Sequence, residues 1–492
     1  MNRINKANLI LAENLVEDIM DKFEACGIAA AIINGDGNTV FEKFWGVRDK
    51  ESGKEMNGDT IFGIASVTKS FTCLAIMQME ERGILDLDDP VSKYIPEFTN
   101  KNQDKITIRH LMSHAAGFFP LPRILVNQVA EALGLDESVT GDFAYHDGLA
   151  QEGIRLIAKR LDEQTKENGL NGKPGEYLSY CNDGFCLLSD IIRRYGGEPS
   201  FADYLIKNIL KPLHMDRSFC DFLRPSLDEN AATLYKKIDG SMVGHRNYND
   251  NSLVLNGSGA MKSTLNDLKK YLQMYLNLGR TADGTRILSQ YRVREMCKPR
   301  QPYNGNGYYG YGVSMKNMDD LTIIEHGGSL TGVSSHIAWS YEADAAVIVL
   351  CNTSGVPVSL ISDGLMKVYN GKSPVEKRDS WQETPWSEET RHSAAGTYVS
   401  GEGITVKLYL KEDGSIGLTE DEKEKPLITV SPYTAIVRNP YSDLFLRLIS
   451  DEERGIFAIA SGSRMIPRRR YAIRTLISTF PWKHMGRLNK FL

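Results

Sequence analysis

The sequence predicts an α+β protein in two parts: a large unit with strands at both ends and helices in its middle, and a small unit of short strands. Apolar, strand-like runs occur within 27–47 and again within 321–351, whereas helical periodicity dominates from about 118 to 250. A charged segment with two prolines then leads into recurring short alternating runs. The predicted parts are a domain over 1–370 with an all-helical subdomain at about 118–250, a linker over 371–390, and a β-sandwich or β-barrel over 391–492.

The first elements follow from local patterns. The opening segment predicts an amphipathic helix whose apolar positions are Leu9, Ile10, Leu15 and Ile19. The runs GIAAAIIN and TVFEKFWGV, joined by Gly-Asp-Gly-Asn, predict a β-hairpin over 27–47. A helix is expected from Ser66 to Arg82, because Gly83 is a good C-terminal stop.

Later segments show the hydrophobic spacing either of helices or of strands. Helices are expected within 152–164, 186–196, 201–213 and 268–278, and strands at 321–325, 333–340 and 345–351. The C-terminal runs are GTYVS, ITVKLYL, GSIGLT, YTAIVR, LFLRLI and GIFAIAS. Their spacing by Gly, Asp and Pro is typical of a small antiparallel β-unit.

Composition excludes several classes of protein. The chain has 492 residues, is 41% hydrophobic and 25% charged, and carries a net charge of −5, which is unlike a disordered protein or a dedicated nucleic-acid binder. No apolar run approaches the ~18 residues of a membrane span. The basic residues between Arg468 and Leu492 suggest a solvated face or a docking tail. We expect no nucleic-acid or membrane partner.

Seven cysteines occur without a CxxC pair. This usage predicts free, mostly buried thiols in a reducing compartment. The N-terminal segment, interrupted by Glu13, Glu17 and Asp18, does not resemble a signal peptide. A cytoplasmic location is therefore expected.

The first chemical motif is Ser66-Val67-Thr68-Lys69, at the start of the predicted helix. Residues i and i+3 share one helix face, so the Lys69 amine can reach the Ser66 hydroxyl. A serine hydroxyl becomes a good nucleophile when a neighbouring base takes its proton. The simpler alternative is a serine near a helix start followed by a solvated lysine.

Two further motifs follow along the chain. Tyr180-Cys181-Asn182 offers a tyrosine that a nearby cation can turn into a base, and an amide that can orient a substrate amide. His326-Gly327-Gly328-Ser329 follows an apolar strand, and its glycines would let a substrate backbone lie against that strand. Taken alone, the tyrosine motif is better explained by a structural tyrosine in a turn. The simpler alternative for the histidine motif is a hairpin entry with a histidine that has its hydrogen-bond partners within the protein.

A metal site is a weaker alternative. His110 and His114 are four residues apart on a predicted helix, but no H-E-x-x-H pattern is present, so we expect neither a metal nor another cofactor.

The order S-x-x-K, Y-x-N and H-x-G resembles the serine β-lactamase and penicillin-binding-protein superfamily, in particular its class C β-lactamase-like branch, which includes D-aminopeptidases and esterases. The resemblance covers roughly residues 8–365. Supporting stretches are GILDLDDPVSKYIPEF, ITIRHLMSHAAGF, GKPGEYLSYCNDGF and GSGAMKSTLNDLKKYL. It implies an antiparallel sheet flanked by helices, with the active site beside an all-helical subdomain. The C-terminal unit resembles the lipocalin-like domain of some relatives.

The resemblance also implies residue roles. Ser66 would be the acylated nucleophile, Lys69 a base or a cation that tunes Tyr180, and Tyr180 the base for acylation. The implied substrate-binding residues are Asn182, His326, Gly328 and Ser329. The backbone N–H groups of Ser66 and Ser329 would form the oxyanion hole.

The third motif departs from the K-T-G of many relatives. A lysine there supplies a permanent positive charge for a substrate carboxylate, whereas a neutral histidine supplies a hydrogen bond only. This departure favours an esterase or a peptidase acting near an uncharged or N-terminal group over a dedicated β-lactamase, although weak β-lactamase activity is compatible with it.

The sequence thus predicts a serine hydrolase that acts through an acyl-enzyme on Ser66 and cleaves small amides, D-residue-containing peptides or esters. An acyltransferase using the same acyl-enzyme is one alternative. A catalytically silent binding or self-assembling protein of the same fold is another. Expected partners are a small molecule or short peptide and, compatibly, further copies of the chain.

The segment 118–150 has two interpretations. It could form a lid that sets substrate choice, or it could pack within the helical subdomain. The residues concerned are Phe118, Phe119, Leu121, Tyr145 and His146.

Overall fold

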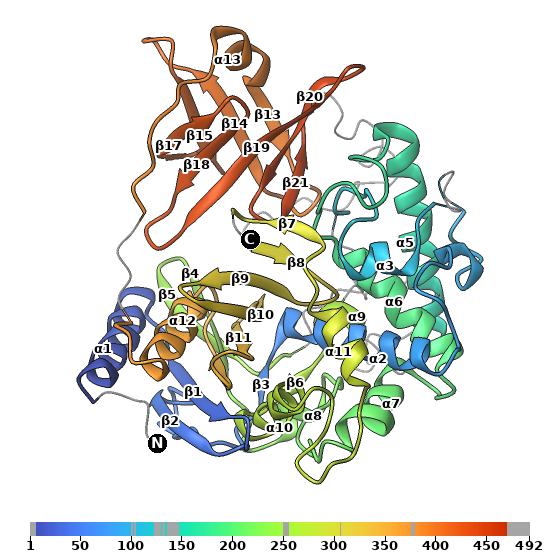
Figure 1. The fold of residues 1–492 in the computed structure, drawn as a ribbon, viewed down its shortest axis with the longest axis vertical. Helices are drawn as coiled ribbons and strands as arrows, with labels where there is room; N and C mark the ends of the chain where they lie inside the picture. Colours follow the sequence, from blue (N-terminus) through green and yellow to red (C-terminus); the bar gives the residue numbers. More distant parts are fainter. Residues whose placement is uncertain are drawn as a thin grey trace.

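The large domain is built on one eight-stranded antiparallel sheet in the order β2-β1-β12-β11-β10-β9-β8-β7 (Figure 1). The computed structural model describes residues 6–99, 105–122, 147–248, 255–305, 307–374 and 379–469, with positions 102, 129, 133 and 134 between them. The strands are β1 (Gly27–Asn34), β2 (Thr39–Gly46), β7 (Gln301–Tyr303), β8 (Gly307–Tyr309), β9 (Ser314–Met318), β10 (Leu321–Leu330), β11 (Val333–Ser340) and β12 (Ala345–Cys351). β1 pairs with β12 from Ile28↔Cys351 to Asn34↔Ala345, so the sheet joins the two strand-rich ends and confirms the predicted fold class.

Helices cover both faces of this sheet. α1 (Lys6–Phe23) and α12 (Val358–Tyr369) pack on one face, where Val16 and Ile19 of α1 are buried. Ile10 stays 55% exposed, so the apolar stripe of α1 is narrower than the sequence predicts. α2 (Thr68–Glu81) and α10 (Leu265–Leu276) lie on the other face.

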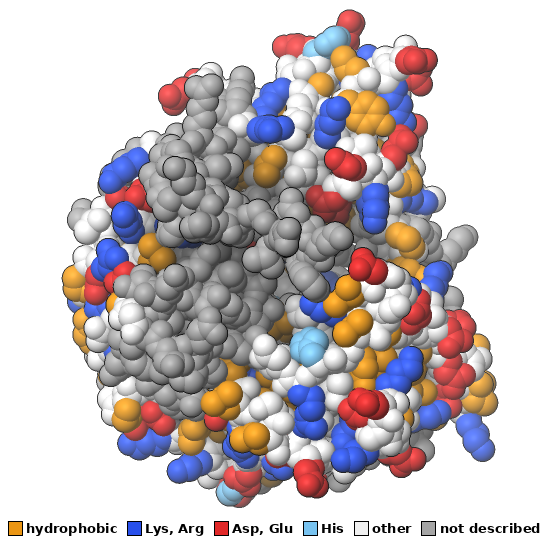
Figure 2. Space-filling model, turned by 180° about the vertical axis from the view of Figure 1, so that it is seen from behind, with side chains coloured by type: hydrophobic (Ala, Val, Ile, Leu, Met, Phe, Trp, Pro, Cys, Tyr) orange, Lys and Arg blue, Asp and Glu red, His pale blue; other side chains and the backbone are white. Residues whose placement is uncertain are grey.

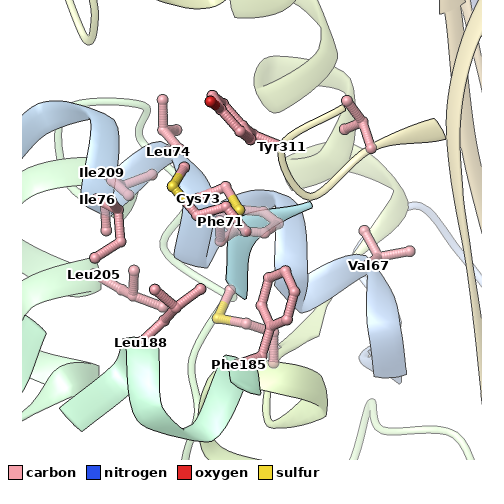
Figure 3. Close-up of a cluster of buried hydrophobic side chains, with 14 of the residues drawn as sticks. Val67, Phe71, Cys73, Leu74, Ile76, Phe185, Leu188, Leu205, Ile209 and Tyr311 are labelled. Carbon is pink, nitrogen blue, oxygen red and sulfur yellow. The ribbon is translucent and has the colours of Figure 1, made fainter. Parts of the chain in front are cut away.

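Helix α2 is the centre of the main core. All of its residues from Thr68 to Met79 are buried, and Phe71 stacks on Tyr271 of α10 with ring centroids 3.8 Å apart. Figure 3 shows side chains of α2 surrounded by apolar residues from several other elements. A helix buried on all sides gives a rigid support for the residues at its N-terminal end.

The middle of the chain forms the helical subdomain. Its helices are α3 (Ile108–Met112), α5 (Asp147–Asn168), α6 (Asn182–Tyr195), α7 (Phe201–Leu205) with a π-helical continuation (Ile206–Leu210), and α8 (Arg224–Leu227). Further helices in the described part of the large domain are the short α9 (Leu255–Gly259), α11 (Gln290–Met296) and the 3-10 turns Ala65–Val67 and Val91–Lys93.

The expectation of an all-helical segment up to residue 250 is wrong at its end. β4 (Leu234–Ile238) and β5 (Ser241–His245) form a hairpin there. Asp239 and Gly240 at its tip both have positive φ, 48° and 82°, as a two-residue type I′ turn requires. The Asp-Gly pair was a usable signal, and the few apolar residues beside it hid the strands.

The C-terminal domain consists of two antiparallel sheets that share a core and follow α13 (Glu388–Ala394). The first contains β13 (Gly396–Val399), β14 (Thr405–Leu410), β15 (Ile416–Glu420) and β16 (Lys423–Lys425). The second contains β17 (Leu427–Ser431), β18 (Thr434–Arg438), β19 (Asp443–Asp451), β20 (Gly455–Ser461) and β21 (Arg464–Pro467). An isolated bridge from Tyr398 to Arg468 links their edges, and the described strands do not close into a barrel.

This domain is docked on the large one. Phe119 packs against Ile449, Phe457 and Met465 of the C-terminal domain. The Arg454 guanidinium donates to the Leu170 carbonyl oxygen at 3.1 Å, and the Phe445 amide donates to Asn304 Oδ1 at 3.2 Å. Figure 1 shows the β20–β21 end of the domain standing over β7 and β8.

The described part of the segment 118–150 packs against both domains. Phe118 and Leu121 are buried in the main core, which fits subdomain packing, and Phe119 faces the C-terminal domain. Tyr145, His146 and the basic residues beyond Arg469 lie outside the described residues.

On the face seen in Figure 2, acidic and basic side chains are interspersed over the described surface. No helix of the described ranges is long and apolar enough to cross a bilayer.

Candidate active site

Ser66 lies in a tight turn at the N-terminal end of α2. The turn is a 3-10 helix (Ala65–Val67) that continues directly into α2. Ala65 is fully buried and has φ 46°, a left-handed conformation that is uncommon for a residue with a side chain. Such strain is held only where packing over-determines it, and it concentrates at functional sites.

Lys69 is fully buried one turn after Ser66. Its Nζ donates to Ser66 Oγ at 3.0 Å and to the Ser258 carbonyl oxygen at 2.8 Å. Burial, reinforced by the charge of Arg464, lowers the pKa of Lys69 well below its usual range. The neutral amine, the form that can accept a proton from Ser66, is therefore much more accessible than for an exposed lysine.

Tyr180 faces both groups from the segment just before α6. The Lys69 Nζ is 4.8 Å from the centroid of the Tyr180 ring. Burial raises the pKa of Tyr180 above its usual value, while Arg464 and the side chain of Ser66 oppose that rise. The Tyr180 ring also lies beside His114, with ring centroids 4.1 Å apart.

His326, the histidine of the third motif, lies on β10 and is buried. Its Nδ1 is 2.7 Å from the Gly327 carbonyl oxygen and its Nε2 is 3.0 Å from the Tyr309 hydroxyl. The carbonyl can only accept, so Nδ1 carries the proton and Nε2 accepts from Tyr309. Both nitrogens thus have partners within the protein, and His326 orients Tyr309, whose ring meets that of Tyr180 edge-on.

Gly328 and Ser329 follow in the same strand, which continues through the motif instead of ending before it. A Cβ on Gly328 would lie 2.2 Å from the Ile64 carbonyl oxygen, so only glycine lets β10 approach the segment that carries Ser66. A cleft of about 330 Å³ opens beside Ser66. It is lined by Tyr180, Tyr303, Tyr309, His326, Ser329 and Arg464, among others.

Asn182 begins α6 and has an unexpected partner. Its Nδ2 donates to Glu402 Oε1 at 3.2 Å. Glu402 lies between β13 and β14 of the C-terminal domain, and its other carboxylate oxygen accepts from Arg464 Nε at 2.6 Å.

Arg464 completes this group from the first position of β21. Its guanidinium carbon is 4.3 Å from the centroid of the Tyr180 ring, and the carbonyl of Ser463 accepts from the Tyr180 amide at 2.9 Å. Glu402 and Arg464 were not predicted from the sequence. No local signal marks them, because they reach the site only through the docking of a separate domain.

The site brings Ser66, Lys69, Tyr180, Asn182, His326, Gly328 and Ser329 into one region, as their motifs predict. Cys181 is buried and is not among the residues that line the cleft, and its Sγ is 3.4 Å from Asp183 Oδ2. In the described ranges, no group of three or more His, Cys, Asp or Glu residues is placed to hold a metal ion.

Residues 12–365 match the Beta-lactamase family model. The chain belongs to the β-lactamase family. The matched part of this β-lactamase-family protein contains all three motifs, and Glu402 and Arg464 lie beyond it.

Relatives support the same membership. The chain is 25% identical to the protein named flp of Staphylococcus aureus over 345 residues, which are 69% of this chain and 62% of flp. It is 24% identical to penicillin-binding protein 4* of Bacillus subtilis over 355 residues, 69% of this chain and 71% of the relative. The chain thus spans less than two thirds of flp.

Solved structures match nearly the whole chain. The octameric penicillin-binding protein homologue from Pyrococcus abyssi covers 92% of this β-lactamase-family protein and 98% of its own chain, with 25% identity and a TM-score of 0.63. Since the family model ends at residue 365, this coverage extends the likeness into the C-terminal domain.

The buried histidine predicts an acid-sensitive fold. Burial, with the nearby charge of Lys69, lowers the pKa of His326 to about 3. The unfolded chain protonates this residue below pH ~6.5, whereas the folded chain does not until pH falls much further, so unfolding takes up a proton and stability falls as pH decreases. At pH 5, this single group is expected to cost about 2 kcal/mol of unfolding free energy.

Urea unfolding of the wild type and His326→Gln between pH 7.5 and 5 measures this effect. Over that range the unfolding free energy of the variant is expected to fall by about 2 kcal/mol less than that of the wild type, because the variant lacks the His326 proton uptake. His392→Gln, at a histidine whose side chain is 64% exposed, serves as the control. Equal pH slopes for the wild type and His326→Gln would contradict the buried, neutral state of His326.

Proposed function

We propose that this protein is a metal-independent serine hydrolase that forms an acyl-enzyme on Ser66. The observation that carries the proposal is the buried Lys69 amine 3.0 Å from the Ser66 hydroxyl, in a cleft where Tyr180 also reaches Ser66. Membership of the β-lactamase family supports it.

The first half of the reaction transfers the acyl group. The Ser66 proton moves to the Lys69 amine while Oγ bonds to the substrate carbonyl carbon, and backbone N–H groups of Ser66 and Ser329 stabilise the oxyanion. The bond to the leaving amine or alcohol then breaks, and the leaving group takes a proton delivered through Tyr180. The pKa directions favour Lys69 over Tyr180 as the group that accepts the Ser66 proton, because burial lowers the pKa of the first and raises that of the second.

The second half releases the acyl group. Water, or another nucleophile that enters the cleft, gives a proton to the Lys69 amine as it attacks the ester carbon. The bond between that carbon and Ser66 Oγ then breaks, and Oγ takes the proton from Lys69. Water gives a hydrolase, and an amine or alcohol gives an acyltransferase.

The substrate class we propose is a small amide, a D-residue-containing peptide or an ester. The cleft of about 330 Å³ suits a small ligand or one or two residues of a peptide. A neutral His326 replaces the lysine that other family members place in this motif, which disfavours substrates that need a fixed cation at that position.

Hydrolysis of a four-compound panel tests the proposal. The panel contains a short p-nitrophenyl ester, the D- and L-alanine p-nitroanilides and a chromogenic cephalosporin, each assayed with the wild type and Ser66→Ala. D-anilide turnover that requires Ser66 is expected for a D-specific peptidase, and ester turnover alone indicates an esterase or an acyltransferase. Absence of Ser66-dependent turnover on all four, together with no acyl adduct by mass spectrometry, would contradict the proposed function.

We further propose that the protein self-associates and resides in the cytoplasm. The octameric state named for the P. abyssi homologue supports self-association, and the seven cysteines, all free thiols, support a reducing compartment. Size-exclusion chromatography with light scattering and cell fractionation test the two statements.

A further inference from the structure

The C-terminal domain places an ion pair directly against the catalytic groups. Arg464 Nε and Glu402 Oε2 are 2.6 Å apart, and the two side chains are only 27% and 24% exposed. Arg464 lies over the Tyr180 ring, and Glu402 accepts from Asn182. A partly buried pair at such a position has a stronger electrostatic effect than a surface pair.

The hairpin that carries Arg464 is fixed relative to Tyr180. The Ser463 carbonyl accepts from the Tyr180 amide, and Arg464 Nη1 donates to the Ser463 hydroxyl at 2.8 Å. Behind the hairpin, Phe457 and Met465 pack against Phe119 of the large domain. The position of the guanidinium therefore depends on domain docking as well as on the contacts that hold the Arg464 side chain.

Among the described residues, few groups around Tyr180 and Lys69 carry a charge at pH 7. The other titratable groups around them are Cys73, His114, Cys181, Tyr303, Tyr309 and His326. Burial keeps all six neutral at pH 7, because it raises the pKa of each thiol and phenol and lowers that of each imidazole. Asp183 is directed to Cys181 and the Leu121 amide. Arg464 and Glu402 are thus the fixed charges nearest the Ser66–Lys69–Tyr180 group.

We propose that Arg464 is a positioning residue of the active site: the C-terminal domain supplies, through Arg464 restrained by Glu402, the cation that readies Tyr180 and Lys69 to take and pass on the Ser66 proton. The inference rests on the proposed acyl-enzyme chemistry. It explains how a member of this family with a neutral histidine in its third motif retains a second cation beside its tyrosine. In this proposal, residues of both domains form the active site.

The two charges have opposite expected effects. Arg464 lowers the pKa of both Lys69 and Tyr180, and Glu402 raises the pKa of both. Whichever group is the base, loss of the Arg464 charge raises its pKa, and loss of the Glu402 charge lowers it. A purely structural role predicts instead that both variants harm the site in the same direction, since each breaks the same ion pair.

The experiment compares Arg464→Met, Arg464→Lys and Glu402→Gln. Methionine keeps the aliphatic contact with Tyr180 without the charge, lysine keeps the charge, and glutamine keeps an acceptor for Arg464 and a partner for Asn182. Arg454→Met is the matched control, because Arg454 also bridges the two domains, at Leu170 and away from the cleft.

The first readout is the rate of Ser66 modification by a fluorophosphonate as a function of pH, followed by intact mass. In this reaction the Oγ–P bond forms, fluoride leaves and the base takes the Ser66 proton. The rate therefore rises with pH as the base loses its proton, and this rising limb of the pH–rate profile gives the pKa of the base without a known substrate. Turnover of a neutral p-nitrophenyl ester supplies kcat and KM separately.

For Arg464→Met we expect the rising limb to move up by about one pH unit, with a fall of up to about tenfold in rate on that limb. Arg464→Lys is expected to restore most of the wild-type profile. Glu402→Gln is expected to move the limb to lower pH, and Arg454→Met to leave it in place. KM for the neutral ester is expected to change by less than about threefold, since Arg464 acts on proton transfer and not on that substrate.

Three results would overturn the inference. The first is an unmoved limb in Arg464→Met with KM unchanged for every ester. The second is a shift of the same sign in Arg464→Met and Glu402→Gln. The third is an unmoved limb with a raised KM confined to carboxylate-bearing esters, which would make Arg464 a substrate-binding group. A wild-type protein that is not modified at Ser66 would instead contradict the proposed function itself, and with it this inference.

Discussion

Replacing Ser66 with alanine is expected to lower turnover of every substrate of this protein by about 10³-fold or more. The hydroxyl is the only atom that can carry the acyl group in the proposed reaction, and removal of one oxygen from a buried turn leaves the packing of α2 unchanged. Initial rates with the p-nitrophenyl ester measure the loss, and intact mass spectrometry checks that no acyl adduct forms. Thermal unfolding is expected to shift by no more than a few degrees.

Ser70→Ala is a matched control for that experiment. Ser70 lies one turn further along α2, is buried, and donates to the Val67 carbonyl oxygen at 2.8 Å, but it does not line the cleft. Its replacement is expected to cost about 1 kcal/mol of stability and to leave acylation intact. Retention of most of the turnover in purified Ser66→Ala would refute the assignment of the nucleophile.

The second large effect is expected from Lys69→Met. A positioned proton acceptor contributes about 10²–10⁴-fold to rate, and methionine fills nearly the same space without an amine. Stability is expected to stay constant or to rise, because a buried lysine is replaced by an apolar residue of similar shape, and the two acceptors that lose a donor are the Ser258 carbonyl and the partly exposed Ser66 hydroxyl. Activity and stability should therefore move in different directions.

Lys262→Met separates this effect from the loss of any buried lysine. Lys262 is 2% exposed, donates to the Cys220 carbonyl oxygen at 3.0 Å, and does not reach Ser66. We expect it to keep turnover within a few-fold of the wild type in the same assay. Equal losses of activity in the two variants would show that the Lys69 effect is structural.

Local patterns in the sequence predicted much of the fold. β1, β11 and β12 have the predicted bounds. In β1 and β12 the signal is a run of apolar residues between turns, which fits a strand buried on both faces. The β4–β5 hairpin was missed because its exposed positions leave little apolar pattern. β10 extends past its apolar run because the glycines of the third motif pair with β11.

The active site was predictable only as far as its motifs reach. Ser66 and Lys69 are three residues apart on one helix, so their contact follows from geometry alone. Glu402 and Asn182 are 220 residues apart and belong to different domains, and neither residue stands in a pattern that signals the other. Docking between domains depends on surface shape, which a single sequence does not display.

The pairing of β1 with β12 has a consequence for synthesis of the chain. β1 leaves the ribosome with only β2 to pair with, and its second edge stays unpaired until β12 follows, roughly 300 residues later. At translation rates of about 5–20 residues per second, this wait lasts roughly 15–60 s. During that time the apolar strand GIAAAIIN presents an open edge to other nascent chains. Expression yield should therefore depend on chaperone supply and on translation speed more than on the stability of the finished domain.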